Sequence, residues 1–223
     1  MIRCEGLGFD YRDGTRALDG LDLHISGGER VAITGRNGSG KSTLVRHWNG
    51  LLRPTRGRVS VDGRSTEGRR VAELARTVGL VFQDPGAQIF SGTCRAEVAF
   101  GARNVGLRGS DLEVSVEAGL AAVGLEGAAE TNPYDLGRAR RKLLTIAAVL
   151  AMRTPVVVLD EPTPGQDARG LALVRAVVAN LATEGRSVVA ISHDRRFIAE
   201  SFPRVVVLDA GRVVADGTPA EVL

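Results

Sequence analysis

Two segments of this sequence carry the residue types and spacing needed to bind and hydrolyse a nucleoside triphosphate. The first is a glycine-rich loop between a stretch that predicts a strand (31–34) and one that predicts a helix (42–49). Its glycines let successive N–H groups face one point, and the helix adds the positive end of its dipole. Lys41 can reach the β- and γ-phosphates, and Ser42 can ligate Mg²⁺. The predicted phosphate-binding residues are Gly35, Arg36, Asn37, Gly38, Ser39, Gly40, Lys41, Ser42 and Thr43.

The second segment is an apolar run at 156–159 that ends in two carboxylates, Asp160 and Glu161. Ligands of open α/β sheets bind at the carboxyl ends of the strands, so this position predicts an acidic group beside the phosphate loop. Asp160 would hold Mg²⁺, through water, and Glu161 would be the general base that orients the attacking water. A strand ending in solvated acids is common by itself, but the phosphate loop favours the functional interpretation.

Three further residues are candidates with an ordinary structural alternative. Gln83 follows an expected strand at 78–82, and its amide could contact the metal or the attacking water. His193 ends the expected strand 187–191 on the same sheet edge as Asp160, which suits a γ-phosphate sensor. Tyr11 could stack on adenine, although a lone tyrosine more often packs in a core.

The composition indicates a globular protein with few features of a nucleic-acid binder. The chain has 223 residues, of which 43% are hydrophobic, and a net charge of +3. Of its 29 cationic side chains 27 are Arg, which are scattered rather than clustered, and aromatic residues make up only 4%. We therefore expect no nucleic-acid partner. Cys4 and Cys94 have no metal-site spacing, and no signal-peptide core or membrane-length apolar run is present, which predicts a cytoplasmic protein.

The expected elements form an α/β nucleotide-binding core with a mostly parallel sheet, an antiparallel β subdomain and a helical insertion. We expect one domain, 1–223, in which 1–84 and 154–223 make the core and 85–153 the helical subdomain. The remaining expected strands are 7–11, 18–25, 30–34, 58–63, 156–159 and a hairpin of 205–208 with 212–214, and the expected helices are 110–123, 141–152 and 171–183.

Taken in order, these residues resemble the motifs of ATP-binding-cassette (ABC) ATPases over essentially the whole chain. The segment 52–63 also looks like a turn typical of that family. The resemblance implies ATP and Mg²⁺ as ligands. It also implies these roles: Tyr11 as the adenine-stacking aromatic, residues 35–43 as Walker A, Gln83 as the Q-loop, 156–161 as Walker B with its catalytic Glu161, Asp167 in the D-loop and His193 as the switch histidine.

A finer resemblance points to the ATP-binding subunits of energy-coupling-factor importers, which take up vitamins or transition-metal ions such as cobalt and nickel. It rests on residues 81–85, 88–91, Thr93 and 98–101. In that family the segment after the Q-loop faces a transmembrane component, so residues 84–101 would be the coupling surface. The resemblance also implies a separate substrate-binding membrane protein and a location on the inner face of the cell membrane.

The sequence departs from this family at the signature, where Leu-Ser-Gly-Gly-Gln is expected. Leu136 is followed by Gly137, Arg138, Ala139 and Arg140, although the following helix keeps its register. Gly137 lacks the serine hydroxyl that would contact the γ-phosphate, and Arg138 and Ala139 place side chains where bare glycine N–H groups should approach it. An arginine could restore a phosphate contact, but a weakened contact is the preferred interpretation.

The degenerate signature leaves several functions open for this chain. In this family each ATP lies between one subunit's Walker A and the other subunit's signature, so we expect a second, non-identical ABC ATPase with an intact signature. The alternatives are a catalytically weak regulatory subunit, the ATPase of a conventional ABC transporter, and a soluble ABC protein of translation or DNA repair. Proteins of the last kind usually join two cassettes or insert long coiled coils. Retention of Glu161 and His193 favours catalysis.

Overall fold

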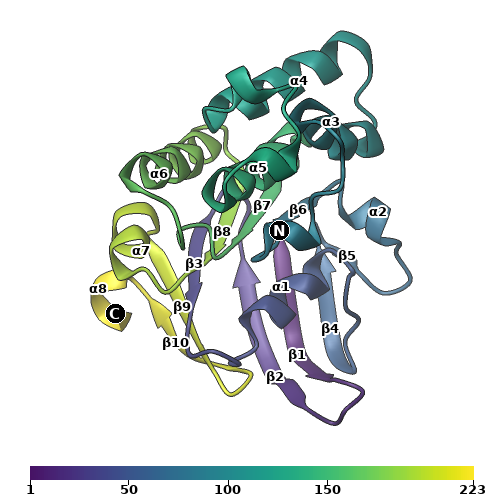
Figure 1. Cartoon of the computed structure of the whole chain (residues 1–223). Coiled ribbons are helices and arrows are strands. Elements are labelled where there is room, and N and C mark those ends of the chain that lie inside the picture. Colours follow the sequence, from purple (N-terminus) through teal and green to yellow (C-terminus); the bar gives the residue numbers. More distant parts are fainter.

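The computed structural model describes all of residues 1–223, and its centre is a six-stranded sheet in the order β10-β9-β3-β8-β7-β6 (Figure 1). Every neighbouring pair in it is parallel except β9 with β10. Strands β7 and β8 are buried at every residue, as expected for apolar strands covered on both faces. Its strands are β3 (Arg30–Thr34), β6 (Val78–Val81), β7 (Val156–Asp160), β8 (Ser187–Ile191), β9 (Arg204–Asp209) and β10 (Arg212–Gly217).

A second, four-stranded antiparallel sheet has the order β2-β1-β4-β5. It comprises β1 (Ile2–Asp10), β2 (Arg16–Ile25), β4 (Arg56–Val61) and β5 (Arg64–Ser65). β1 begins five residues before the expected strand at 7–11, because Ile2 pairs with both Ile25 and Val61. The pairing slips between Cys4 and Leu7, around Gly6 with its φ of 56°. This irregularity breaks the period-two pattern that marks a strand in sequence.

Helices α3 (Cys94–Val105), α4 (Gly109–Ala122) and α5 (Arg138–Ala151) pack against one another within residues 85–153. α5 begins three residues before the expected helix at 141–152, so the degenerate signature forms its first turn. The other helices are α1 (Lys41–Trp48), α2 (Val71–Leu74), α6 (Ala168–Thr183), α7 (Arg195–Ser201) and α8 (Pro219–Val222), with short 3₁₀ turns η1 (Pro85–Ala87), η2 (Glu126–Ala128) and η3 (Pro133–Asp135).

Two apolar clusters lie on the two faces of the six-stranded sheet. Along β7, Val157 and Leu159 join the cluster under α3, α4, α5 and α6, while Val156 and Val158 join the cluster shared with α1, β1 and β2. The predicted α/β fold with a mostly parallel sheet, an antiparallel sheet and a helical layer is confirmed. This arrangement brings the carboxyl ends of β3, β6, β7 and β8 to one edge of the sheet.

Candidate active site

The glycine-rich loop joins β3 to α1 and is fixed at two glycines. Gly35 has a φ of 139°, and a Cβ on it would lie 2.0 Å from the backbone oxygen of Leu208 in β9. Gly40 has a φ of 98°, and its Cβ would lie 2.4 Å from the backbone oxygen of Ala17 in β2. Both positions require glycine, because the positive φ disfavours other residues and because a Cβ atom would overlap the neighbouring backbone oxygen. The loop is therefore held between the two sheets.

The ammonium of Lys41, the first residue of α1, lies against this loop. Its Nζ donates to the backbone oxygens of Gly35 at 2.7 Å and Arg36 at 2.8 Å. Burial lowers the pKa of Lys41, and the nearby carboxylates of Glu161 and Asp160 oppose that shift. A cation next to loop N–H groups and a helix N-terminus is a combination that binds phosphate.

Asp160, the last residue of β7, is 3% exposed and has an unsatisfied acceptor. Its Oδ1 atom is buried and accepts no hydrogen bond. Burial raises the pKa of Asp160, while the Ser42 hydroxyl and the charge of Lys142 lower it. Mg²⁺ is commonly held by one or two protein oxygens together with the phosphates of its substrate. A free carboxylate oxygen near a serine hydroxyl fits that chemistry.

Glu161 follows Asp160 in a left-handed conformation, with a φ of 50°. Its backbone N–H donates to the oxygen of Ile191 at 2.9 Å, and its Oε1 lies 3.2 Å from Nε2 of His193. Burial, and then the charge of Asp160, raise the pKa of Glu161. Burial, and then the charge of Lys41, lower the pKa of His193, which favours its neutral imidazole. A carboxylate with a raised pKa beside a neutral imidazole can accept a proton from water.

Tyr11 lies in the turn between β1 and β2 and contacts the end of the phosphate loop. Its hydroxyl is 2.9 Å from Oγ1 of Thr43, and its ring packs edge-to-face on Phe9 with centroids 4.9 Å apart. The residue remains 37% exposed. Tyr11 therefore has the exposure that an adenine-stacking residue needs.

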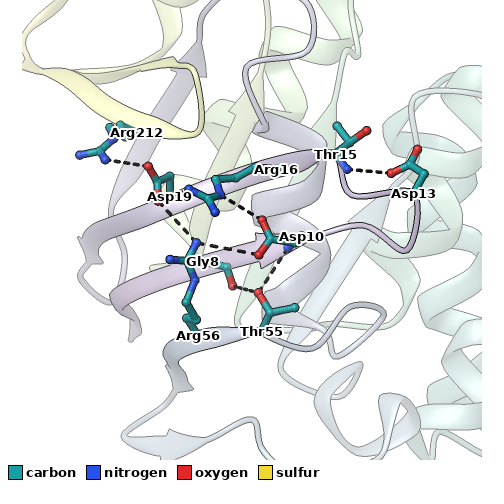
Figure 2. A network of polar contacts seen from close by, with 9 residues as sticks. All are labelled: Gly8, Asp10, Asp13, Thr15, Arg16, Asp19, Thr55, Arg56 and Arg212. Atoms are coloured by element: carbon teal, nitrogen blue, oxygen red, sulfur yellow. Dashed lines mark hydrogen bonds and ion pairs between the residues drawn. The ribbon is translucent and has the colours of Figure 1, made fainter.

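A network of ion pairs holds both ends of this turn (Figure 2). Arg16 at the start of β2 donates to Asp10 at the end of β1, at 3.1 Å. Arg56 of β4 lies 3.9 Å from Asp10 and 3.5 Å from Asp19. Arg212 of β10 donates to Asp19 at 2.6 Å. The network therefore ties three strands of the antiparallel sheet to the edge strand of the other sheet.

One cavity of about 440 Å³ collects most of the predicted site at the carboxyl edge of the parallel strands. Gln83 reaches it from the loop after β6. Among the predicted loop residues, Gly35, Arg36 and Ser39 are not in its lining. The lining residues are Tyr11, Thr15, Asn37, Gly38, Gly40, Lys41, Ser42, Thr43, Gln83, Asp160, Glu161, Ile191 and His193.

The degenerate signature lies outside this cavity. Gly137 is the N-cap residue of α5 and provides no side-chain cap. Arg138 and Ala139 line a smaller cavity of about 280 Å³ that also contacts Glu161. Arg140 lines a different cavity, of about 470 Å³. Within one chain the signature therefore does not share a cavity with the phosphate loop.

One predicted residue lies outside the cavity, and one residue beside the cavity is not among the predictions. Asp167 caps α6, where its carboxylate accepts the N–H of Gly170 at 2.7 Å, and it does not line the 440 Å³ cavity. Lys142 was not identified from the sequence, yet it is buried beside Asp160. Its only sequence signal is a lysine among the apolar residues of an expected helix.

Comparison with known proteins agrees with this geometry. Residues 18–164 match the ABC transporter family. The chain belongs to the ABC transporter family. It is 40% identical to the energy-coupling factor transporter ATP-binding protein EcfA of Methanothermobacter thermautotrophicus, over 100% of this chain and 72% of that protein. It is 42% identical to EcfA of Carboxydothermus hydrogenoformans, over 97% of this chain and 80% of that protein.

Solved structures give the same picture. The structure of cbiO1 from Clostridium perfringens, part of the ABC transporter complex cbiONQ, is 35% identical with a TM-score of 0.87, over 99% of this chain and 89% of that one. The dimeric structure of an ATP-binding cassette in a post-hydrolysis state, bound to ADP and Pi, is 26% identical with a TM-score of 0.90. The match covers 98% of this chain and 99% of that one. The chain is thus an ABC-type ATP hydrolase that binds ATP. None of its helices combines the length and hydropathy needed to cross a bilayer.

Proposed function

We propose that this ABC ATPase powers an energy-coupling-factor import complex, which takes up a vitamin or a transition-metal ion. The observation that carries the proposal is the cavity that unites Lys41, Asp160, Glu161 and His193. The chain also resembles energy-coupling factor ATP-binding proteins over nearly its whole length.

In this proposal the charged and polar residues at the centre of the cavity have defined tasks. Lys41 and the N–H groups of the loop bind the β- and γ-phosphates. Ser42, Asp160 and Gln83 would hold Mg²⁺, which would neutralise charge on the phosphates when bound. Glu161 accepts the proton of the attacking water, and His193 orients the Glu161 carboxylate and contacts the γ-phosphate.

The degenerate signature supports an asymmetric pair of ATPases. Two copies of this chain would face both nucleotides with Gly137, Arg138 and Ala139. A different subunit with an intact signature would complete the site on this chain, and the reciprocal site would be the weaker one. In this arrangement Asp167 lies in the loop that faces the second subunit.

Residues 84–101 have the properties of a docking surface for a transmembrane component. Phe90 is 59% exposed and Phe100 47%, and their rings pack edge-to-face with centroids 4.7 Å apart. The loop that carries Phe90 is fixed by the buried side chain of Glu97, which accepts hydrogen bonds from the backbone N–H groups of Phe90 at 3.1 Å and Ser91 at 2.8 Å. An exposed apolar pair on a fixed backbone favours protein contact. This contact would hold the chain at the inner face of the cell membrane.

The test is recovery of partners from solubilised membranes with the tagged chain. We expect a membrane protein and a second ABC ATPase with the wild type, and equally with Val114→Ala, which removes an exposed apolar side chain from α4. The double variant Phe90→Ala/Phe100→Ala should lose about tenfold or more of the membrane component while keeping ATP binding. Undiminished recovery would contradict the docking surface. Recovery with ribosomes alone would support a soluble ABC protein instead.

A further inference from the structure

Lys142 is a buried cation whose hydrogen bonds all go to backbone oxygens. It lies in the first half of α5 and is 3% exposed. Its Nζ donates to the oxygen of Phe82 at 2.7 Å, of Gln83 at 2.7 Å and of Asp160 at 2.9 Å. No carboxylate lies within ion-pair distance of it. The three ammonium protons are therefore all used, and they join α5 to the ends of β6 and β7.

These three contacts explain why a lysine stands here. Lys41 and Lys142 are the only lysines among 29 basic residues, and the rest are arginines. An ammonium is compact and directs three donors tetrahedrally, whereas a guanidinium is flat and larger. Three oxygens converging on one atom fit the first group and not the second.

Two of the three bonded oxygens belong to residues of the predicted ATP site, and the third belongs to Phe82, next to Gln83. Gln83 and Asp160 line the nucleotide cavity. The peptide group between Asp160 and Glu161 is fixed at both ends: Lys142 bonds its C=O, and the oxygen of Ile191 accepts its N–H at 2.9 Å. This peptide leads into the left-handed backbone of Glu161. Lys142 therefore bonds the peptide group that joins the two carboxylate residues of the site.

We propose that Lys142 is a positioning residue for ATP hydrolysis, which fixes the Asp160–Glu161 peptide and the backbone of Gln83 so that the site can hold Mg²⁺. It acts through the metal-binding and base residues and does not itself touch ATP. It also lies one turn after the degenerate signature on α5. A shift of that helix, such as one imposed by a partner subunit, would move these carboxylates directly.

The test separates metal-dependent from metal-independent nucleotide binding in the purified chain. A fluorescent ATP analogue is titrated first in EDTA and then at increasing Mg²⁺. Lys142→Met should keep the EDTA affinity within about twofold. It should raise the half-saturating Mg²⁺ concentration about tenfold or more, as lost support of a metal ligand does. Hydrogen exchange should quicken at residues 82–84 but not at 36–43.

Two further variants test whether the tetrahedral arrangement of the Lys142 donors is required. Lys142→Arg keeps the charge but not the tetrahedral donors, so it should raise the half-saturating Mg²⁺ concentration as Lys142→Met does. Thr145→Val is the matched control: it removes a buried hydrogen bond that lies entirely within α5, from the Thr145 hydroxyl to the backbone oxygen of Lys142 at 2.8 Å. It should behave as wild type.

Each outcome is decisive. A wild-type half-saturating Mg²⁺ concentration in Lys142→Met or in Lys142→Arg overturns the proposal, and so does an equal rise in Thr145→Val. If Lys142→Met fails to fold, the charged Lys142→Arg variant decides alone. The assay needs no partner or membrane protein, so its result is independent of the proposed import function.

Discussion

Replacement of Glu161 by Gln tests the assignment of the general base most directly. The amide has nearly the volume of the carboxylate and still reaches His193, which lies 3.2 Å from Oε1. It cannot accept a proton from water. The backbone that presents the side chain is held by the N–H bond to Ile191 and is unaffected by the change.

The size of the effect follows from what is removed and what remains. Loss of a general base typically slows turnover by about 10²–10⁴-fold, or about 3–5 kcal/mol of transition-state stabilisation. ATP binding should be unchanged or tighter, because Lys41 and the loop are intact and one negative charge near the phosphates is gone. The variant should therefore accumulate bound, unhydrolysed ATP.

The assay is single-turnover hydrolysis by the assembled complex, with nucleotide retention measured on the same samples. Glu67→Gln is the matched control, because Glu67 is exposed and does not line the cavity. This variant should hydrolyse ATP at the wild-type rate. His193→Ala should also slow turnover. A wild-type rate for Glu161→Gln in the complex would refute the assignment of Glu161 as the base.

Three further outcomes are expected. Lys41→Ala should weaken ATP affinity tenfold or more, because each lost charge-assisted bond is worth about 1.5–3 kcal/mol; an unchanged titration would rule out the loop assignment. Because burial raises the pKa of Glu161 above 4.5 and only the ionised carboxylate accepts a proton, hydrolysis should fall on acidification at a pH above that of an ordinary glutamate. A pH–rate profile with its acid limb at or below pH 4.5 would contradict this. The lone chain should hydrolyse ATP slowly, and mutation of the partner's signature serine should abolish fast turnover in the complex; brisk hydrolysis by a homodimer would exclude the asymmetric pair.

Much of the site was predictable because its motifs are local. The loop at 35–43 and the pair Asp160 and Glu161 each combine chemistry and position within a few residues, and the parallel sheet brings them together. Strand β1 was only partly predictable, because the irregularity at Gly6 hides its alternation and its partners are distant in sequence.

Other features depend on contacts that no local pattern contains. Lys142 acts on Phe82 and Gln83, about 60 residues earlier, and on Asp160, 18 residues later. The left-handed backbone of Glu161 is a consequence of tertiary packing, since nothing in its residue type favours a φ of 50°. α7 was missed although Asp194 caps it by accepting the N–H of Phe197 at 3.0 Å, because a seven-residue helix shows too little periodicity.

The position of β3 has a consequence for the order in which this protein is made. β3 leads into the phosphate loop, and its two neighbours in the sheet, β8 and β9, come from residues 187–209. The loop itself rests on the oxygen of Leu208 at Gly35. On a ribosome the earlier residues emerge first, so the phosphate loop lacks both of its neighbouring strands until residues 187–209 have left the exit tunnel. We therefore expect ATP binding to begin only after β8 and β9 have joined the apolar clusters on the two faces of the sheet.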